Sequence, residues 1–102
     1  MITPQAACIP CEPEVAELVP GYLANRRRDV SLLIRLVEHD TLESWAQIET
    51  IAHRVAGTAA SYGMPQLGEI AREIEKRARA SDFTGARLFV ISFEREVSFL
   101  SA

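Results

Sequence analysis

Hydrophobic residues recur three and four positions apart along most of the chain, a spacing that predicts helices. The clearest series forms one apolar stripe over more than two heptads: Trp45, Ile48, Ala52, Val55, Ala59 and Tyr62. Gly63 follows this series and predicts a helix stop. Pro65 then predicts the start of another helix after a very short turn.

The same pattern predicts two helices before this stripe. A short helix from Glu14 to Val19 is expected first, and Pro20-Gly21 then breaks the chain or changes its direction. A longer helix is expected from about Tyr22 to Glu38. Its apolar residues fall on one side: Leu23, Val30, Leu33, Ile34 and Val37.

The helix with the clearest stripe is preceded by a turn at residues 39–41, where Asp40 or Thr41 is the expected N-cap. The segment after Pro65 has its own helical series: Leu67, Ile70, Ala71, Ile74 and Ala78. Ser81-Asp82 indicates the next turn. The last helix carries Leu88 or Phe89, then Phe93, Val97 and Leu100.

No segment alternates with period two for long enough to predict a strand. Four substantial helices with short connections predict an all-α fold, an antiparallel up-down-up-down four-helix bundle. We expect the short N-terminal helix to fold against one end. Residues 1–12 contain two prolines and two cysteines but no apolar period, so we expect a flexible tail, with the bundle spanning residues 13–102.

The composition fits one compact domain, because 48% of the 102 residues are hydrophobic and 25% are charged. A net charge of -3 argues against nucleic-acid binding. The run Arg26-Arg27-Arg28 is expected on a solvated helical face, with a partner or phosphate contact as the alternative. No apolar run approaches 18 residues and no signal peptide is evident, so we expect no membrane span and a cytoplasmic protein.

The only cysteines are Cys8 and Cys11. Two thiols cannot complete a tetrahedral zinc site within one chain, and we expect them to stay reduced. An intermolecular metal site or a disulfide in the tail is the alternative. A protein that functions through these thiols is a third hypothesis, although no strand precedes them as in a redox motif.

His53 points away from the predicted core. At about 100° per residue, it lies roughly 130° from the core direction of its helix. The neighbouring residues on its face are mostly very small: Ala46, Glu49, Thr50, Ala56, Gly57 and Ala60. Gly57 costs about 1 kcal/mol relative to alanine inside a helix, and it leaves the approach to the imidazole open. A surface histidine without a role is the alternative interpretation.

The turn predicts a partner for His53. With the turn centred at Met64, His53 lies eleven positions before it and Glu75 eleven positions after it. In two antiparallel helices these residues stand at the same height. Glu75 can therefore accept a hydrogen bond from one imidazole nitrogen and leave the other nitrogen nucleophilic. A solvated charge is the alternative for Glu75.

Arginines lie near the same position. Arg72 stands level with Ala56 and shares one stripe with Glu75 and Arg79. A cation close to His53 would help to hold an anion there. Ordinary surface charges are the alternative for both arginines.

The residues around His53 resemble those of a known family. The run from His53 to Gly57, followed by Tyr62-Gly63, Leu67 and Ile74-Glu75, is similar to the histidine-containing phosphotransfer (HPt) domain. The resemblance extends more loosely to the run from Val19 to Arg27. It implies a four-helix bundle with an exposed histidine that relays a phosphoryl group between aspartates of receiver domains in two-component signalling.

Carried over by position, the resemblance makes His53 the phosphorylated residue, with Gly57 clearing access and Glu75 near the imidazole. One departure concerns Ala56, because the family usually has lysine there, three residues after the histidine. Arg54 and Arg72 are the candidates to replace that charge. The departure also supports an alternative function, a degenerate docking module that binds signalling partners without being phosphorylated.

The expected function is therefore a relay protein rather than a free-standing enzyme. Its partners are receiver domains of response regulators or hybrid histidine kinases, and it needs no cofactor or metal of its own. The receiver supplies the acidic Mg²⁺ pocket that phosphoryl transfer requires. We expect a monomer whose His53 attacks through Nε2.

Overall fold

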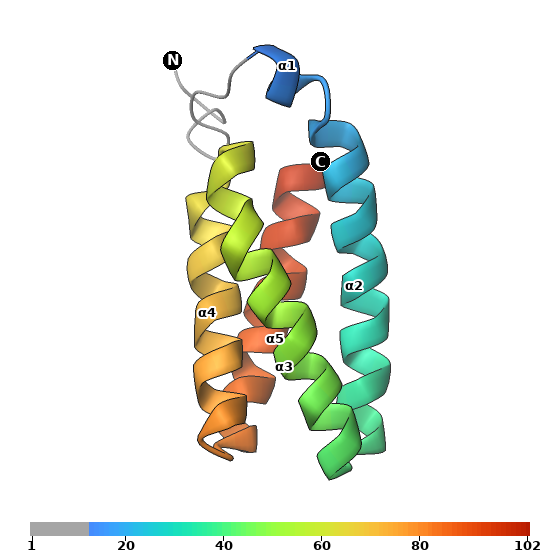
Figure 1. The fold of residues 1–102 in the computed structure, drawn as a ribbon. Coiled ribbons are helices and arrows are strands. Elements are labelled where there is room, and N and C mark those ends of the chain that lie inside the picture. Colours follow the sequence, from blue (N-terminus) through green and yellow to red (C-terminus); the bar gives the residue numbers. More distant parts are fainter. Residues whose placement is uncertain (1–12) are drawn as a thin grey trace.

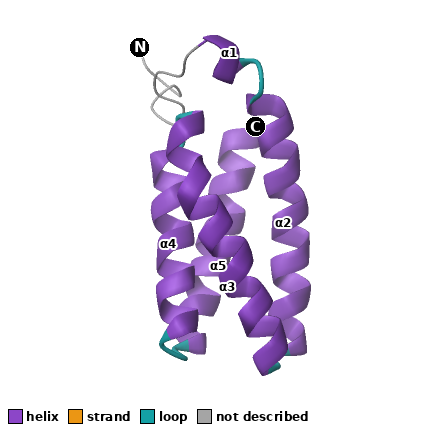
Figure 2. Ribbon diagram, in the orientation of Figure 1, coloured by secondary structure: helices purple, strands orange, loops and turns teal. Residues whose placement is uncertain are grey.

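The computed structural model describes residues 13–102, which form helices joined by short connections (Figures 1 and 2). Their order is α1 (Pro13–Ala16), α2 (Val19–His39), α3 (Leu42–Thr58), the 3₁₀ helix η2 (Ala59–Tyr62), α4 (Pro65–Arg79) and α5 (Phe83–Ser101). No strand occurs in this part of the chain. The predicted all-α helical bundle is confirmed.

The four long helices lie side by side, and their connections alternate between the two ends of the bundle (Figure 1). Helix α3 packs against α2 and α4, and α5 packs against the same two helices from the other side. The short helix α1 lies at one end, where it contacts η2. This arrangement places one face of α3 and the adjoining face of α4 on the outside of the bundle.

Helix α3 begins at a reciprocal cap. The Thr41 hydroxyl accepts the Ser44 amide proton at 3.0 Å, and the Ser44 hydroxyl accepts the Thr41 amide proton at 2.9 Å. Two backbone donors that have no intrahelical acceptor are thereby satisfied. Thr41 is the N-cap, one of the two residues predicted for this position.

The turn between α3 and α4 depends on a glycine and a proline. The α-helix ends at Thr58 and continues as η2, and Gly63 then adopts a φ of 78°, which favours glycine. The Gly63 amide donates to the Ala60 carbonyl at 3.0 Å. Pro65 occupies the first turn of α4. The predicted stop at Gly63 and start at Pro65 are confirmed.

The prediction for the start of α2 is wrong. The helix begins at Val19 and includes Pro20 and Gly21, where a break was expected. Proline is tolerated in a first turn because an amide proton there has no intrahelical acceptor to lose. Helix α1 is correspondingly shorter than predicted and ends at Ala16.

The core is formed by side chains from all four long helices and from the α3–α4 turn. The largest fully buried ones are Leu33, Ile48, Val55, Met64, Leu67, Ile74, Phe93 and Val97. Ile34 was predicted to face the core, but it is 37% exposed, whereas Leu36 is buried. A helix turns about 100° per residue, so Leu36 returns to within about 60° of Leu33, whereas Ile34 turns further away.

The arginine run on α2 also differs from its prediction. Arg27 and Arg28 are exposed as expected, but Arg26 is buried. Its Nε donates to Asp29 at 2.8 Å, and its guanidinium lies 4.4 Å from the centre of the Tyr22 ring. The apolar stem and the paired charge allow arginine to pack in this position.

Within residues 13–102, none of the helices combines the length and the apolar character that a membrane span needs. Cys8 and Cys11 lie outside the described residues, and so does the predicted tail.

Glu96 on α5 generates a prediction about pH. Burial raises the pKa of its carboxyl group, and no hydrogen bond or ion pair reaches it from the described residues. A raised folded pKa means that the folded state binds the proton more tightly, so stability is lost as the pH rises through that value. We expect Glu96→Gln to increase the free energy of unfolding at pH 7 in urea titrations.

This gain should shrink as the pH falls to about 4, where the parent carboxyl is itself protonated. Glu94→Gln, at an exposed position on the same helix, is the control. An equal gain in both variants at both pH values would show that net charge is the cause, and that burial of Glu96 is not.

Candidate functional site

His53 lies on the outer face of α3, with 75% of its side chain exposed. The opposite face of the helix holds it in the bundle through Ile48, Ala52 and Val55, each at most 2% exposed. The apolar period of the helix therefore determines the outward direction of the imidazole. The structure agrees with the direction predicted from the stripe.

One imidazole nitrogen is engaged by the neighbouring helix. Nδ1 of His53 lies 2.6 Å from Oε2 of Glu75 on α4, and the Glu75 side chain is only 10% exposed. An ionised carboxylate can only accept, so Nδ1 carries the proton in this hydrogen bond. In neutral imidazole the lone pair is then on Nε2. The pair stands at the height predicted from the turn.

Arg79 joins this pair to a second carboxylate. Its Nη2 donates to Oε2 of Glu75 at 2.8 Å, and its Nε donates to Oε2 of Glu49 at 2.8 Å. The hydrogen bond to Glu49 is the main cause that raises the pKa of Arg79, and the negative charges of Glu49 and Glu75 add to it. Arg79 is therefore a permanent cation that bridges α3 and α4.

The side chains around His53 enclose a shallow hollow of about 230 Å³. Its lining residues are Glu49, Thr50, His53 and Arg79. The Thr50 hydroxyl donates to the Ala46 carbonyl at 3.1 Å, so it is directed along its own helix. The hollow consequently presents one cation beside the histidine, supplied by α4.

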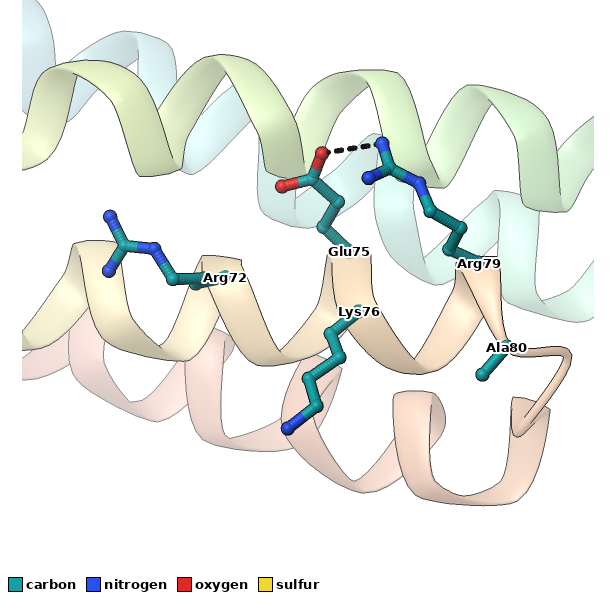
Figure 3. Close-up of a pocket in the computed structure, with 5 residues that line it drawn as sticks. All are labelled: Arg72, Glu75, Lys76, Arg79 and Ala80. Atoms are coloured by element: carbon teal, nitrogen blue, oxygen red, sulfur yellow. Dashed lines mark hydrogen bonds and ion pairs between the residues drawn. The ribbon is translucent and has the colours of Figure 1, made fainter.

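A second hollow of about 420 Å³ lies over α4 and is lined by Arg72, Glu75, Lys76, Arg79 and Ala80. Figure 3 shows the Glu75 and Arg79 side chains directed toward α3, while Lys76 points away from it. Arg72 donates to Glu69 of its own helix at 2.7 Å, with both side chains largely exposed. No contact joins Arg72 to His53 among the described residues.

The surface beside His53 is open and lacks a cation on α3. Ala56 is half-buried against the core, and Gly57 and Ala60 are exposed. Apart from the adjoining residues and the backbone of its own helix, a Cβ added at Gly57 would meet nothing within 4 Å. Packing within the bundle therefore does not require glycine at this position, and the space above it is free for a partner.

Arg54 follows His53 on α3, but its side chain lies on a different surface. It lines a groove between α2 and α3 together with Leu32, Gln47 and Thr50. It makes no ion pair within residues 13–102. The arginine best placed beside the imidazole is therefore Arg79, whereas Arg54 and Arg72 were the predicted substitutes for the missing lysine.

Arg79 was expected on the stripe of Glu75 but was not among the residues predicted to form the site. The sequence does contain a signal for this residue. Glu49 lies four positions before His53, and Arg79 lies four positions after Glu75. The register that pairs His53 with Glu75 thus also pairs Glu49 with Arg79.

The arrangement offers a nucleophilic nitrogen, a carboxylate that orients it and an open approach. Within the described residues, no group of three or more histidine, cysteine, aspartate or glutamate side chains is placed to hold a metal ion. The family model of the Hpt domain matches residues 17–97.

The chain belongs to the HPt family. HPt domains are phosphotransfer carriers of two-component signalling, and they interact with receiver domains. No curated protein and no solved structure shows significant similarity to this HPt chain. The matched region includes α2, α3 and α4 and most of α5, and therefore all the residues described around His53.

Gly57 generates a prediction about stability. Its Cβ would meet open space, so Gly57→Ala should gain helix propensity without strain and raise the free energy of unfolding by about 1 kcal/mol in urea titrations. Gly68→Ala is the matched control, because its Cβ would lie 3.4 Å from that of Ala59 and the gain should be smaller. A destabilised Gly57→Ala would contradict the open surface.

Proposed function

We propose that this HPt domain is a phosphorelay intermediate. In this proposal His53 accepts a phosphoryl group from a receiver-domain aspartate and passes it to another receiver. The observation that supports it most strongly is the 2.6 Å hydrogen bond between Nδ1 and Glu75 on an imidazole that is otherwise exposed. With Nδ1 engaged, Nε2 is the nitrogen available to a partner.

The proposed step needs no other nucleophile. The Nε2 electron pair forms the N–P bond while the P–O bond to the receiver aspartate breaks, and the electron pair of that bond stays on the aspartate carboxylate. The ring keeps its Nδ1 proton and becomes positively charged. Glu75 opposes this charge directly, so it stabilises the cationic ring as the bond forms. The reverse step delivers the phosphoryl group to the next aspartate.

The receiver supplies the remaining requirements in this proposal. Phosphoryl transfer needs an in-line approach and neutralisation of the phosphoryl charge, usually by Mg²⁺. We place that ion in the acidic pocket of the receiver. The open surface above Gly57 supports close approach of such a partner, because a side chain there would stand between the two surfaces.

A second candidate function is a docking module that is not phosphorylated. The half-buried Ala56 favours it, because the cation that the family usually presents three residues after the histidine is missing. In that case the same face of α3 binds a receiver without accepting phosphate. The two functions differ in what happens to His53.

The test is to incubate the chain with a phosphorylated receiver domain and Mg²⁺. The measurement is the amount of acid-labile, alkali-stable phosphate that the chain then carries. We expect His53→Gln to abolish this label. His39→Gln is the matched control and should retain it, because His39 is the other histidine and lies exposed at the end of α2.

Equal labelling of His53→Gln and the parent would refute the proposal. An unlabelled parent that still binds the receiver, with unchanged affinity in His53→Ala, would instead support the docking module.

A further inference from the structure

The carboxylate that orients His53 is shared with a cation. Oε2 of Glu75 accepts both from His53 Nδ1 at 2.6 Å and from Arg79 Nη2 at 2.8 Å. Two donors on one oxygen compete for the same negative charge. The strength with which Glu75 holds the imidazole proton therefore depends on Arg79.

Arg79 is itself held by a second anchor. Glu49, one turn before His53 on α3, accepts from its Nε at 2.8 Å. Because Glu49 and Glu75 lie on different helices, the Arg79 guanidinium bridges α3 and α4 through two hydrogen bonds. The guanidinium is thus fixed beside Glu75 although 64% of its side chain is exposed.

We propose that Arg79 is a positioning residue that sets the lifetime of phosphohistidine at His53 by acting through Glu75. This inference rests on the proposed phosphorelay function. Arg79 partly neutralises the negative charge of Glu75. It therefore lowers the affinity of Nδ1 of the phosphorylated ring for its proton.

The chemistry gives this proton its importance. When phosphohistidine transfers its group, the N–P bond breaks and its electron pair returns to Nε2. The phosphoryl group moves to an aspartate oxygen, or to a water oxygen that then releases a proton to solvent. If Nδ1 is protonated, the leaving group is a neutral imidazole, which departs more readily than an imidazolate. A firmly held Nδ1 proton therefore shortens the lifetime, and Arg79 lengthens it.

The other ionisable groups near His53 and Glu75 are paired elsewhere or directed away from them. On α4, Arg72 pairs with Glu69 and Lys76 points away from α3. On α3, Arg54 lines the groove toward α2. Among residues 13–102, α2 and α5 place no charged group in ion-pair contact with His53 or Glu75.

The experiment measures the decay of phosphohistidine, and its transfer to a receiver, between pH 6 and 9. Four chains are compared: the parent, Arg79→Gln, Glu75→Gln and the double variant. We expect Arg79→Gln to decay about two- to fivefold faster near neutral pH, the factor that an exposed ion pair supplies. The pH at which its decay slows should rise by about half a unit.

Glu75→Gln should have the opposite effect, because an amide can accept from Nδ1 without stabilising the cationic ring. In the Glu75→Gln background, Arg79→Gln should then change neither the decay rate nor its pH profile. This double-mutant cycle separates an action through Glu75 from a direct contact with the phosphoryl group.

Arg79→Lys, a further substitution at this position, keeps the charge but loses the bridge to two carboxylates. Its phosphohistidine lifetime should lie between those of the parent and Arg79→Gln. Arg95 is an exposed arginine on α5 that makes no ion pair with residues 13–102, so Arg95→Gln controls for net charge and should match the parent. Urea titrations of all variants identify any that fail to fold.

Two outcomes overturn the inference while the proposed function stands. One is a labelled Arg79→Gln chain with the parent lifetime and pH profile. The other is an Arg79→Gln effect of equal size in the Glu75→Gln background, which would mean that Arg79 contacts the phosphoryl group directly. A parent chain that takes no label at all would instead refute the proposed function, and the inference with it.

Discussion

The register between α3 and α4 is the constraint on which the candidate site depends. The turn that joins these helices is short, and Gly63 at φ 78° together with Pro65 in the first turn leaves little freedom in how α4 begins. Two cross-helix pairs follow from this register. His53 meets Glu75, and Glu49 meets Arg79 one turn away. A shift of one residue between the helices would separate both pairs.

The core maintains this register from the other side. Ile48 and Val55 on α3 and Leu67 and Ile74 on α4 are fully buried, so sliding one helix along the other would require these side chains to repack. The polar network on the outer edge is too exposed to hold the helices by itself. Packing therefore positions the histidine and its carboxylate, and the ion pairs refine their electrostatics.

Periodicity and turn position were sufficient to predict the helices around the site, the outward direction of His53 and its partner Glu75. Those features depend on the 3.6-residue period and on the rise per residue, which side-chain detail does not alter. The same register also brings Glu49 and Arg79 to one height, but whether an arginine pairs across the two helices or within its own helix could not be predicted. Arg72 bonds Glu69 within its own helix, whereas Arg79 crosses to α3. Differences of this kind depend on rotamers that sequence spacing does not specify.

The start of α2 and the burial of Arg26 were missed for related reasons. A proline followed by glycine is compatible with both a break and a first turn, and the packing of the chain decides between them. Arg26 can be buried because Tyr22 and Asp29 lie about one turn away on either side, where both contact its guanidinium. The cation beside His53 is likewise supplied by the neighbouring helix, where Arg72 was the expected residue and Arg79 is the one that contacts Glu75.

The most direct test of the account is a two-bond ¹H–¹⁵N correlation spectrum of the phosphorylated chain with ¹⁵N-labelled histidine. Glu75 accepts a hydrogen bond from Nδ1 of His53, which leaves Nε2 as the proposed nucleophile. We expect a phosphoryl group on Nε2 of His53 and a proton on Nδ1. A phosphoryl group on Nδ1, or a spectrum in which His53 is unmodified after the chain has been labelled, would contradict it.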